Sequence, residues 1–221
     1  MSFRLGPAIS GSSVRSRQGG KPKGAQVRYE NINAVGFIRR EGLEPAGMVI
    51  EPVGPKALIG QYDQLYLAGI EHEFEVGERY TIYRKLKPIL DKETREYIGI
   101  QHLLVGICEI REVLPDTAIA DVTRSWRIIQ RKDLVTPFLE RSPVIEIKES
   151  VPGLIGKFIS NEEHARLTGQ FQTAFIDKGE ADGVEVGDIA ARIGNRLAED
   201  GPCICVNRRA DRIKIVEVDK G

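Results

Sequence analysis

The sequence predicts an all-β protein that carries one small barrel-like or sandwich-like module twice, after a disordered basic N-terminal tail. Short runs of β-branched and aromatic residues alternate with Gly, Pro and Asp, which is typical of strands joined by turns. Few segments show the 3.6-residue period of an amphipathic helix. A stretch of about forty residues recurs later in the chain, which indicates an internal repeat.

The first 34 residues predict the tail. They are rich in Gly, Ser and Arg and have no hydrophobic period. Residues 1–40 contain eight Lys and Arg against one acid, whereas the whole chain of 221 residues is neutral. A basic arm can bind phosphate or anionic lipid headgroups, but a solvated, disordered tail is the simpler interpretation.

The first module is expected over residues 35–140. Its predicted strands lie at residues 47–53, 64–68, 79–84, 98–113 and 117–125, the fourth of them broken or bent near Gly106. The best helix candidate in the chain lies at residues 161–167, with Ser160 or Asn161 as its cap and Gly169 as its stop. Strands at this spacing favour a small barrel or sandwich.

The second module is expected over residues 156–221, after a linker at 141–155. The pattern that begins at Gly47 begins again at Gly156, an offset of 109 that becomes 110 after one inserted residue. We therefore predict a tandem duplication with an abbreviated second copy. The aromatic and glycine positions that match are Tyr62/Phe171, Tyr66/Phe175, Gly60/Gly169, Gly69/Gly179 and Gly77/Gly187.

The repeated glycines are interpreted as structural turn residues. Gly69 and Gly179 follow the second strand of each copy, in turns where glycine accepts a positive φ. Gly77 and Gly187 lie in a second turn, of the form Glu-Val-Gly-acid. Gly60 and Gly169 complete the set of six structural turn glycines, and the pattern needs no ligand to explain it.

A search for chemistry finds no convergent motif. The chain has no nucleophile elbow, phosphate-binding loop, zinc-protease helix or dinucleotide-binding loop. Glu71 and Glu73 would face away from His72 on an extended segment, so a charged turn is favoured over a metal site. The acidic loop at 177–183 lacks the spacing of a calcium cage. We expect no catalytic, cofactor-binding or metal-binding residues, no cofactor, and no enzyme activity.

The cysteine and hydropathy patterns bear on disulfides, membrane spans and secretion. Cys108, Cys203 and Cys205 are an odd set without Cys-x-x-Cys spacing, so buried unpaired thiols are expected. No run approaches the ~18 apolar residues of a membrane span. Residues 1–24 lack the apolar core of a secretory signal, which as written predicts a cytoplasmic chain.

The repeated segments resemble the C-terminal region of bacterial LysM-containing envelope proteins, including the secretin-associated protein of type IV pilus machines. The resemblance covers about residues 35–193, without a LysM domain, and a more distant likeness is to the C-terminal domain of the flagellar assembly protein T. The residues that carry it are Gly169-Gln-Phe171, Asp182-Gly-Val-Glu-Val-Gly187-Asp188 and Lys132-Asp-Leu-Val-Thr-Pro137.

This resemblance implies a non-enzymatic structural or assembly protein of the periplasm or cell envelope. Its partner would be a secretin ring or another pilus or secretion machine, reached by edge-strand addition or through an apolar patch. Peptidoglycan binding is not expected without LysM. The alternative is an RNA-binding β-barrel that uses the basic arm. Its nearest candidate surface combines Tyr80 and Tyr83 with Arg79, Arg84, Lys85 and Lys87, whereas Trp126 is expected in core or interface packing.

Overall fold

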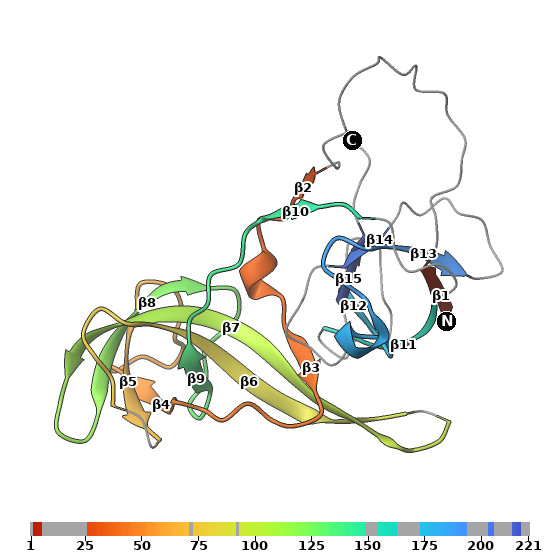
Figure 1. Ribbon diagram of the computed structural model, residues 1–221. Coiled ribbons are helices and arrows are strands. Elements are labelled where there is room, and N and C mark those ends of the chain that lie inside the picture. The colour runs from red at the N-terminus through yellow and green to blue at the C-terminus, as the bar shows by residue number, and fades with distance from the viewer. Residues whose placement is uncertain are drawn as a thin grey trace, which may run out of the picture. The chain divides into compact units, whose positions relative to one another are not determined.

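The chain folds into two compact units of β-structure, seen in the computed structural model of Figure 1. The structure describes residues 2–5, 26–70, 73–91, 93–148, 154–162, 173–193, 203–205 and 214–217. The central unit is Asn31–Arg141, and the terminal unit combines Met1–Glu30 with Ser142–Gly221. Among the described residues the only helical elements are two short 3-10 turns, at Ile32–Ala34 and Glu180–Asp182. The all-β prediction is confirmed.

The central unit contains every strand that was predicted for the first module. Two further short strands, β3 and β9, and the second half of β6 were not predicted. The strands are β3 (Phe37–Arg39), β4 (Gly47–Pro52), β5 (Gln64–Gly69), β6 (Arg79–Leu90), β7 (Tyr97–Val113), β8 (Ala118–Ser125) and β9 (Leu134–Pro137).

Six of these strands close into a ring. Their hydrogen-bonded order is β7-β6-β9-β4-β5-β8, and β8 pairs back onto β7, while β3 pairs with the first part of β7. The predicted irregularity near Gly106 lies where β7 exchanges β3 for β8 as its neighbour. A register shift of β6 between Ile82 and Tyr83 faces this point. A Cβ at Gly106 would lie 2.6 Å from the Arg124 carbonyl oxygen, so the close approach requires glycine.

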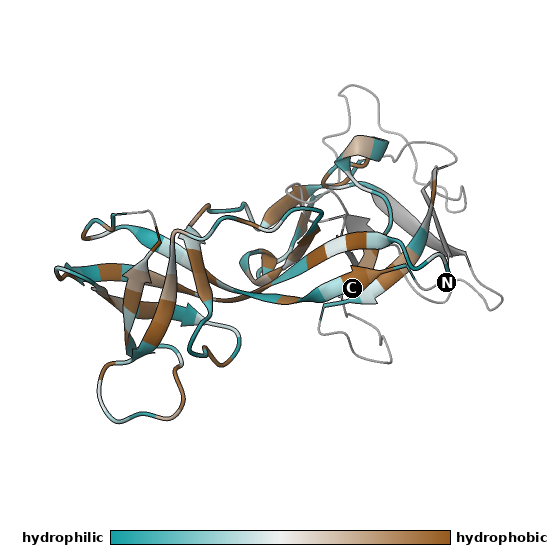
Figure 2. Cartoon of the chain, turned by 90° about the horizontal axis from the view of Figure 1, so that it is seen from below, coloured by the Kyte–Doolittle hydropathy of each residue, from teal (hydrophilic) through white to brown (hydrophobic). Residues whose placement is uncertain are grey.

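The core of the central unit follows from two-residue alternation along its strands. In β5, Leu65 and Leu67 are buried while Tyr66 between them is partly exposed. Figure 2 shows the corresponding alternation of hydrophobic and hydrophilic residues along the strands. Burying one such leucine contributes about 1.5–3 kcal/mol. Cys108 is a buried free thiol, as predicted, and burial raises its pKa to about 12. The side chains of Cys203 and Cys205 lie outside the description.

The terminal unit is also a closed barrel, with the order β1-β11-β12-β15-β14-β13. A separate two-stranded ribbon joins β2 to β10. The strands are β1 (Ser2–Leu5), β2 (Gln26–Arg28), β10 (Val144–Glu146), β11 (Leu154–Asn161), β12 (Thr173–Ile176), β13 (Ile189–Ile193), β14 (Cys203–Cys205) and β15 (Lys214–Glu217).

Two segments differ from their sequence-based expectations. The expected tail contains β1 and β2, because main-chain pairing with a neighbouring strand needs no particular side-chain pattern. The helix start expected at Ser160 or Asn161 is wrong, since both residues lie in β11. That strand pairs its Asn161 with Ala174 of β12. Residues 163–167 of the helix candidate, its expected stop Gly169 and the repeat residue Phe171 lie outside the described residues, as do Glu71 and His72.

The two barrels share their ring order and a strand register. Position by position, β4, β5 and β6 correspond to β11, β12 and β13. Val49 faces Leu67 and Glu51 faces Tyr66, with a register shift between the two pairs. At an offset of 109, Phe158 faces Ile176 and Ser160 faces Phe175, with the same register shift. These matched registers support the predicted duplication, which remains an inference.

Candidate docking surface

A depression of about 500 Å³ lies at one end of the central barrel. Two loops form it, residues 53–63 between β4 and β5 and residues 126–133 between β8 and β9. Ile59 and Ile129 join the loops through a β-bridge, in which the Ile129 N–H donates to the Ile59 carbonyl at 3.1 Å. The lining residues are Pro52, Lys56, Ala57, Leu58, Ile59, Ile128, Ile129, Gln130 and Arg131.

Large apolar side chains reach solvent on this surface. Ile59 and Ile129 are buried, at 3% and 2% exposure, whereas their neighbours Leu58 and Ile128 are 64% and 53% exposed. The side chains of neighbouring residues in an extended segment point to opposite sides. Because Ile59 and Ile129 point into the barrel, Leu58 and Ile128 point to solvent. Tyr62, on the first loop, is 85% exposed. Apolar side chains gathered in this way are typical of an interaction surface.

Two cations border the apolar residues, each paired with an acid of the same unit. Lys56 donates to Asp63, and Arg131 lies 3.3 Å from Glu51. The Lys56 hydrogen bond, followed by that of the Gly60 N–H, lowers the pKa of Asp63. Exposed ion pairs of this kind contribute only about 0–1 kcal/mol. A carboxylate from a binding partner could therefore replace either acid at little cost.

Both loops end in the same four-residue turn. In the first, Asp63 accepts the Gly60 N–H at 2.9 Å, and in the second Asp133 accepts the Gln130 N–H at 2.8 Å. The residue before each acid, Tyr62 or Lys132, has a φ of 71°. Sequence reasoning missed both turns because neither residue is glycine. The signal available was an acid three residues after the start of the turn.

Two of the predicted turn glycines have the expected positive φ, in the same kind of turn, and two others do not. Gly77 and Gly187 have φ values of +88° and +96°, in turns that end at Glu78 and Asp188. Gly69 instead ends β5 opposite Gly47 and is not among the residues with positive φ. Gly179 has a φ of −151°, so the expected positive φ is wrong at both Gly69 and Gly179. A strand pairing and the start of a 3-10 turn need no left-handed residue there.

An ion pair beneath the depression fixes its second loop. Asp133 is 2% exposed and accepts from Arg84 Nε at 2.7 Å and from Arg84 Nη2 at 2.8 Å. Arg84 Nη2 also donates to the Ile128 carbonyl at 3.1 Å. The guanidinium therefore joins β6 to the main chain of a rim residue. Such two-point pairing restricts orientation more than a single contact does.

The surface considered for RNA does not present its aromatic rings. Tyr80 and Tyr83 are 1% and 0% exposed. Burial raises the pKa of Tyr83 to about 12, and burial together with a hydrogen bond to Glu78 raises that of Tyr80. Base stacking needs an accessible ring face. Trp126 is partly exposed, but its indole nitrogen is buried and has no hydrogen-bond partner among the described residues.

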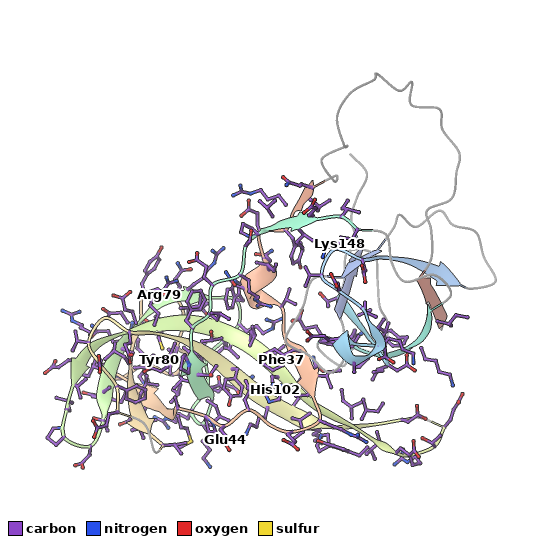
Figure 3. All side chains as sticks on the ribbon, viewed as in Figure 1. Phe37, Glu44, Arg79, Tyr80, His102 and Lys148 are labelled. Carbon is purple, nitrogen blue, oxygen red and sulfur yellow. The ribbon has the colours of Figure 1, made fainter. Side chains whose placement is uncertain are left out.

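A buried histidine lies elsewhere in the central unit. His102 of β7 is fully buried and stacks on Phe37 of β3, with ring centroids 4.8 Å apart (Figure 3). Tyr83 lies 5.6 Å from it on the neighbouring strand. Burial, with smaller contributions from the charges of Lys85 and Arg39, lowers the pKa of His102 to about 4. An imidazole packed between rings in this way acts as a core residue near neutral pH.

Metal-site geometry and membrane helices are both missing from the part of the chain that the structure describes. No group of three or more His, Cys, Asp or Glu side chains there is placed to hold a metal ion. No helix there has the length and apolar character to cross a bilayer. Comparison with protein-family models, curated proteins and solved structures finds no match to this chain in any of the three.

Proposed function

We propose that this chain is a non-enzymatic structural and assembly protein of the bacterial cell envelope. Its partner is a secretin ring or another component of a type IV pilus or secretion machine. The observation that carries the assembly role is the exposed apolar depression on the central barrel, with Leu58 and Ile128 at its rim. The class of partner comes from the resemblance of the repeated segments to LysM-containing envelope proteins.

The composition of the depression suits protein packing better than catalysis. Its lining is mostly aliphatic, and its titratable members are Lys56 and Arg131. Both side chains are about half exposed or more, at 54% and 65%. The lining contributes no carboxylate, imidazole or thiol, the groups that most often act as general acids or bases. Aliphatic side chains with cations at the edge fit a partner segment that is apolar and acidic.

The rigidity of the rim favours specific binding. The Ile59–Ile129 bridge and the hydrogen bond from Arg84 to the Ile128 carbonyl hold the two loops before any partner arrives. A surface that is already ordered loses less conformational entropy when it binds. The exposed apolar side chains of the rim can then act as anchors, since apolar side chains that become buried on binding carry most of the binding energy of an interface.

Affinity capture of the full chain tests this function. A tagged chain is exposed to detergent extract of the source bacterium, and the captured proteins are identified by mass spectrometry. Leu58→Asp combined with Ile128→Asp removes the apolar rim. Val113→Asp is the control, because Val113 is also an exposed apolar residue, at 46%. It pairs with Ala118, which faces Leu67 near the end of β5 that is opposite the rim loop.

A secretin or pilus component should be enriched by the wild type and the control, and at least tenfold less by the rim variant. Equal capture by the rim variant would move the docking site elsewhere. Capture of no envelope component would contradict the assignment. Salt-sensitive binding of RNA that survives deletion of residues 1–34 would instead favour the RNA-binding alternative.

A further inference from the structure

The terminal barrel is completed by a strand from the far end of the sequence. Between β11 and β13 lies β1, which pairs antiparallel with both (Figure 1). On one side Ser2 faces Lys157 and Leu5 faces Leu154. On the other side Ser2 faces Ile193 and Leu5 faces Ala190. All four residues of β1 are thus paired on both edges.

The position of β1 is the position of β9 in the central barrel. There, β9 lies between β4 and β6, the counterparts of β11 and β13. Val135 faces Gly47 and Ile82, as Phe3 faces Gly156 and Arg192. Gly47 and Gly156 differ by the repeat offset of 109, and Ile82 and Arg192 by 110. The four residues of β1 therefore take the places of Leu134–Pro137 one by one.

The two strands are connected to their barrels differently. Eight residues, 126–133, join β9 to β8, and the Arg84–Asp133 pair fixes that connection. Twenty residues, 6–25, separate β1 from the next described strand, β2. An extended segment of that length spans up to about 70 Å. The position between β11 and β13, which we call the strand slot, is thus filled by a segment that is distant in sequence.

We propose that the strand slot is a strand-acceptor site and that its partner is a second copy of this chain, which donates its own Ser2–Leu5. The same segment in a second copy carries the same residues, so it fits the slot in the same register. Reciprocal donation closes a two-fold symmetric dimer in which no main-chain hydrogen bond of the monomer is lost. The proposal does not depend on the envelope partner proposed above.

The balance between the two forms depends on protein concentration. Donation within one chain competes with donation between chains, and a donor strand on the same chain has an effective concentration on the order of 1 mM. Exchange requires β1 to leave its slot, so it is fastest when chains refold together. Refolding at high protein concentration should therefore favour the exchanged dimer over the monomer.

A cross-link between two differently tagged full-length chains tests the exchange. One chain carries Arg4→Cys and the other Ile155→Cys, because Arg4 faces Ile155 across the β1–β11 pairing. The control partner carries Ile128→Cys, since Ile155 and Ile128 are equally exposed at 53%. The chains are unfolded together, refolded at low and at high concentration, and oxidised. A single chain with both Arg4→Cys and Ile155→Cys reports donation within one chain.

The expected result is a mixed disulfide between the Arg4→Cys and Ile155→Cys chains at high concentration. It should exceed cross-linking to the Ile128→Cys control at least tenfold, and a dimer mass should accompany it. A bond that forms only within the doubly substituted chain, at every concentration, would overturn the exchange. The pairing of β1 with β11 is itself contradicted if no disulfide forms either between the two chains or within the doubly substituted chain. It is also contradicted if the control cross-links equally.

Discussion

The Nε2 atom of His102 accepts the backbone N–H of Leu43 at 3.1 Å, which requires this buried imidazole to be neutral. A protonated imidazole has a hydrogen on both nitrogens and cannot accept this bond. Lys85 of β6 faces His102, and Arg39 of β3 faces Ile100, two residues away; both charges oppose a further positive charge on the ring. The Tyr83 hydroxyl donates to the Leu43 carbonyl at 3.4 Å, so both backbone groups of Leu43 are held. Protonation of His102 would release one of these two bonds.

The stability of the central unit should therefore fall in mild acid. The pKa of His102 is about 4 in the folded chain and about 6.5 in an unfolded one, so the unfolded chain binds more protons between these values. This contribution is complete above about pH 6.5 and is lost as pH falls toward 4. At most it is on the order of 3 kcal/mol. Urea unfolding measured from pH 7 to 4 checks this, and His102→Gln should flatten the dependence. An unchanged pH slope in His102→Gln would contradict it.

The Arg84–Asp133 pair should be worth much more than the exposed ion pairs on the same unit. Asp133→Asn leaves a partly buried guanidinium without its counter-charge, and we expect a loss of about 2–3 kcal/mol in the free energy of unfolding. Glu51→Gln, which removes the exposed partner of Arg131, should cost less than about 1 kcal/mol. Urea denaturation of both variants checks the difference. Equal losses would mean that burial of Asp133 does not set the strength of this pair.

Two turn glycines with nearly the same φ should respond differently to alanine. A Cβ at Gly77 meets no atom within 4 Å, so Gly77→Ala should cost only the left-handed strain of about 1–2 kcal/mol. A Cβ at Gly187 would lie 2.0 Å from the Glu146 carbonyl oxygen. Gly187→Ala should therefore also displace residues 146–148, whose Lys148 N–H donates to the Gly187 carbonyl at 2.9 Å. Thermal unfolding should show the larger loss for Gly187→Ala, and equal losses would contradict the close approach.

Sequence patterns predicted the longer strands of the central unit and missed the short ones, both β3 and β9, which bury side chains, and β1, which was recognised by no pattern. The alternation of Leu65 and Leu67 with polar or partly exposed neighbours fixes β5. In contrast, β1 has only four residues, and its place is set by backbone contacts with β11 and β13. The depression was not predicted because it depends on two loops that are about seventy residues apart in the chain. Nothing in either loop alone indicates that Ile59 and Ile129 meet.

At Tyr62, the left-handed residue of the first rim loop, substitution by glycine should leave the protein more stable than substitution by alanine, the reverse of the usual order. Tyr62 has a φ of 71° and is 85% exposed, so its replacement removes little packing. Glycine adopts this conformation freely, whereas alanine keeps a cost of about 1–2 kcal/mol. We expect Tyr62→Gly to be more stable than Tyr62→Ala by about 1 kcal/mol in urea unfolding. At Tyr66, in the extended strand β5, the order should be the opposite, because there glycine only adds freedom to the unfolded chain. The same order at both positions would contradict the left-handed turn that shapes the rim.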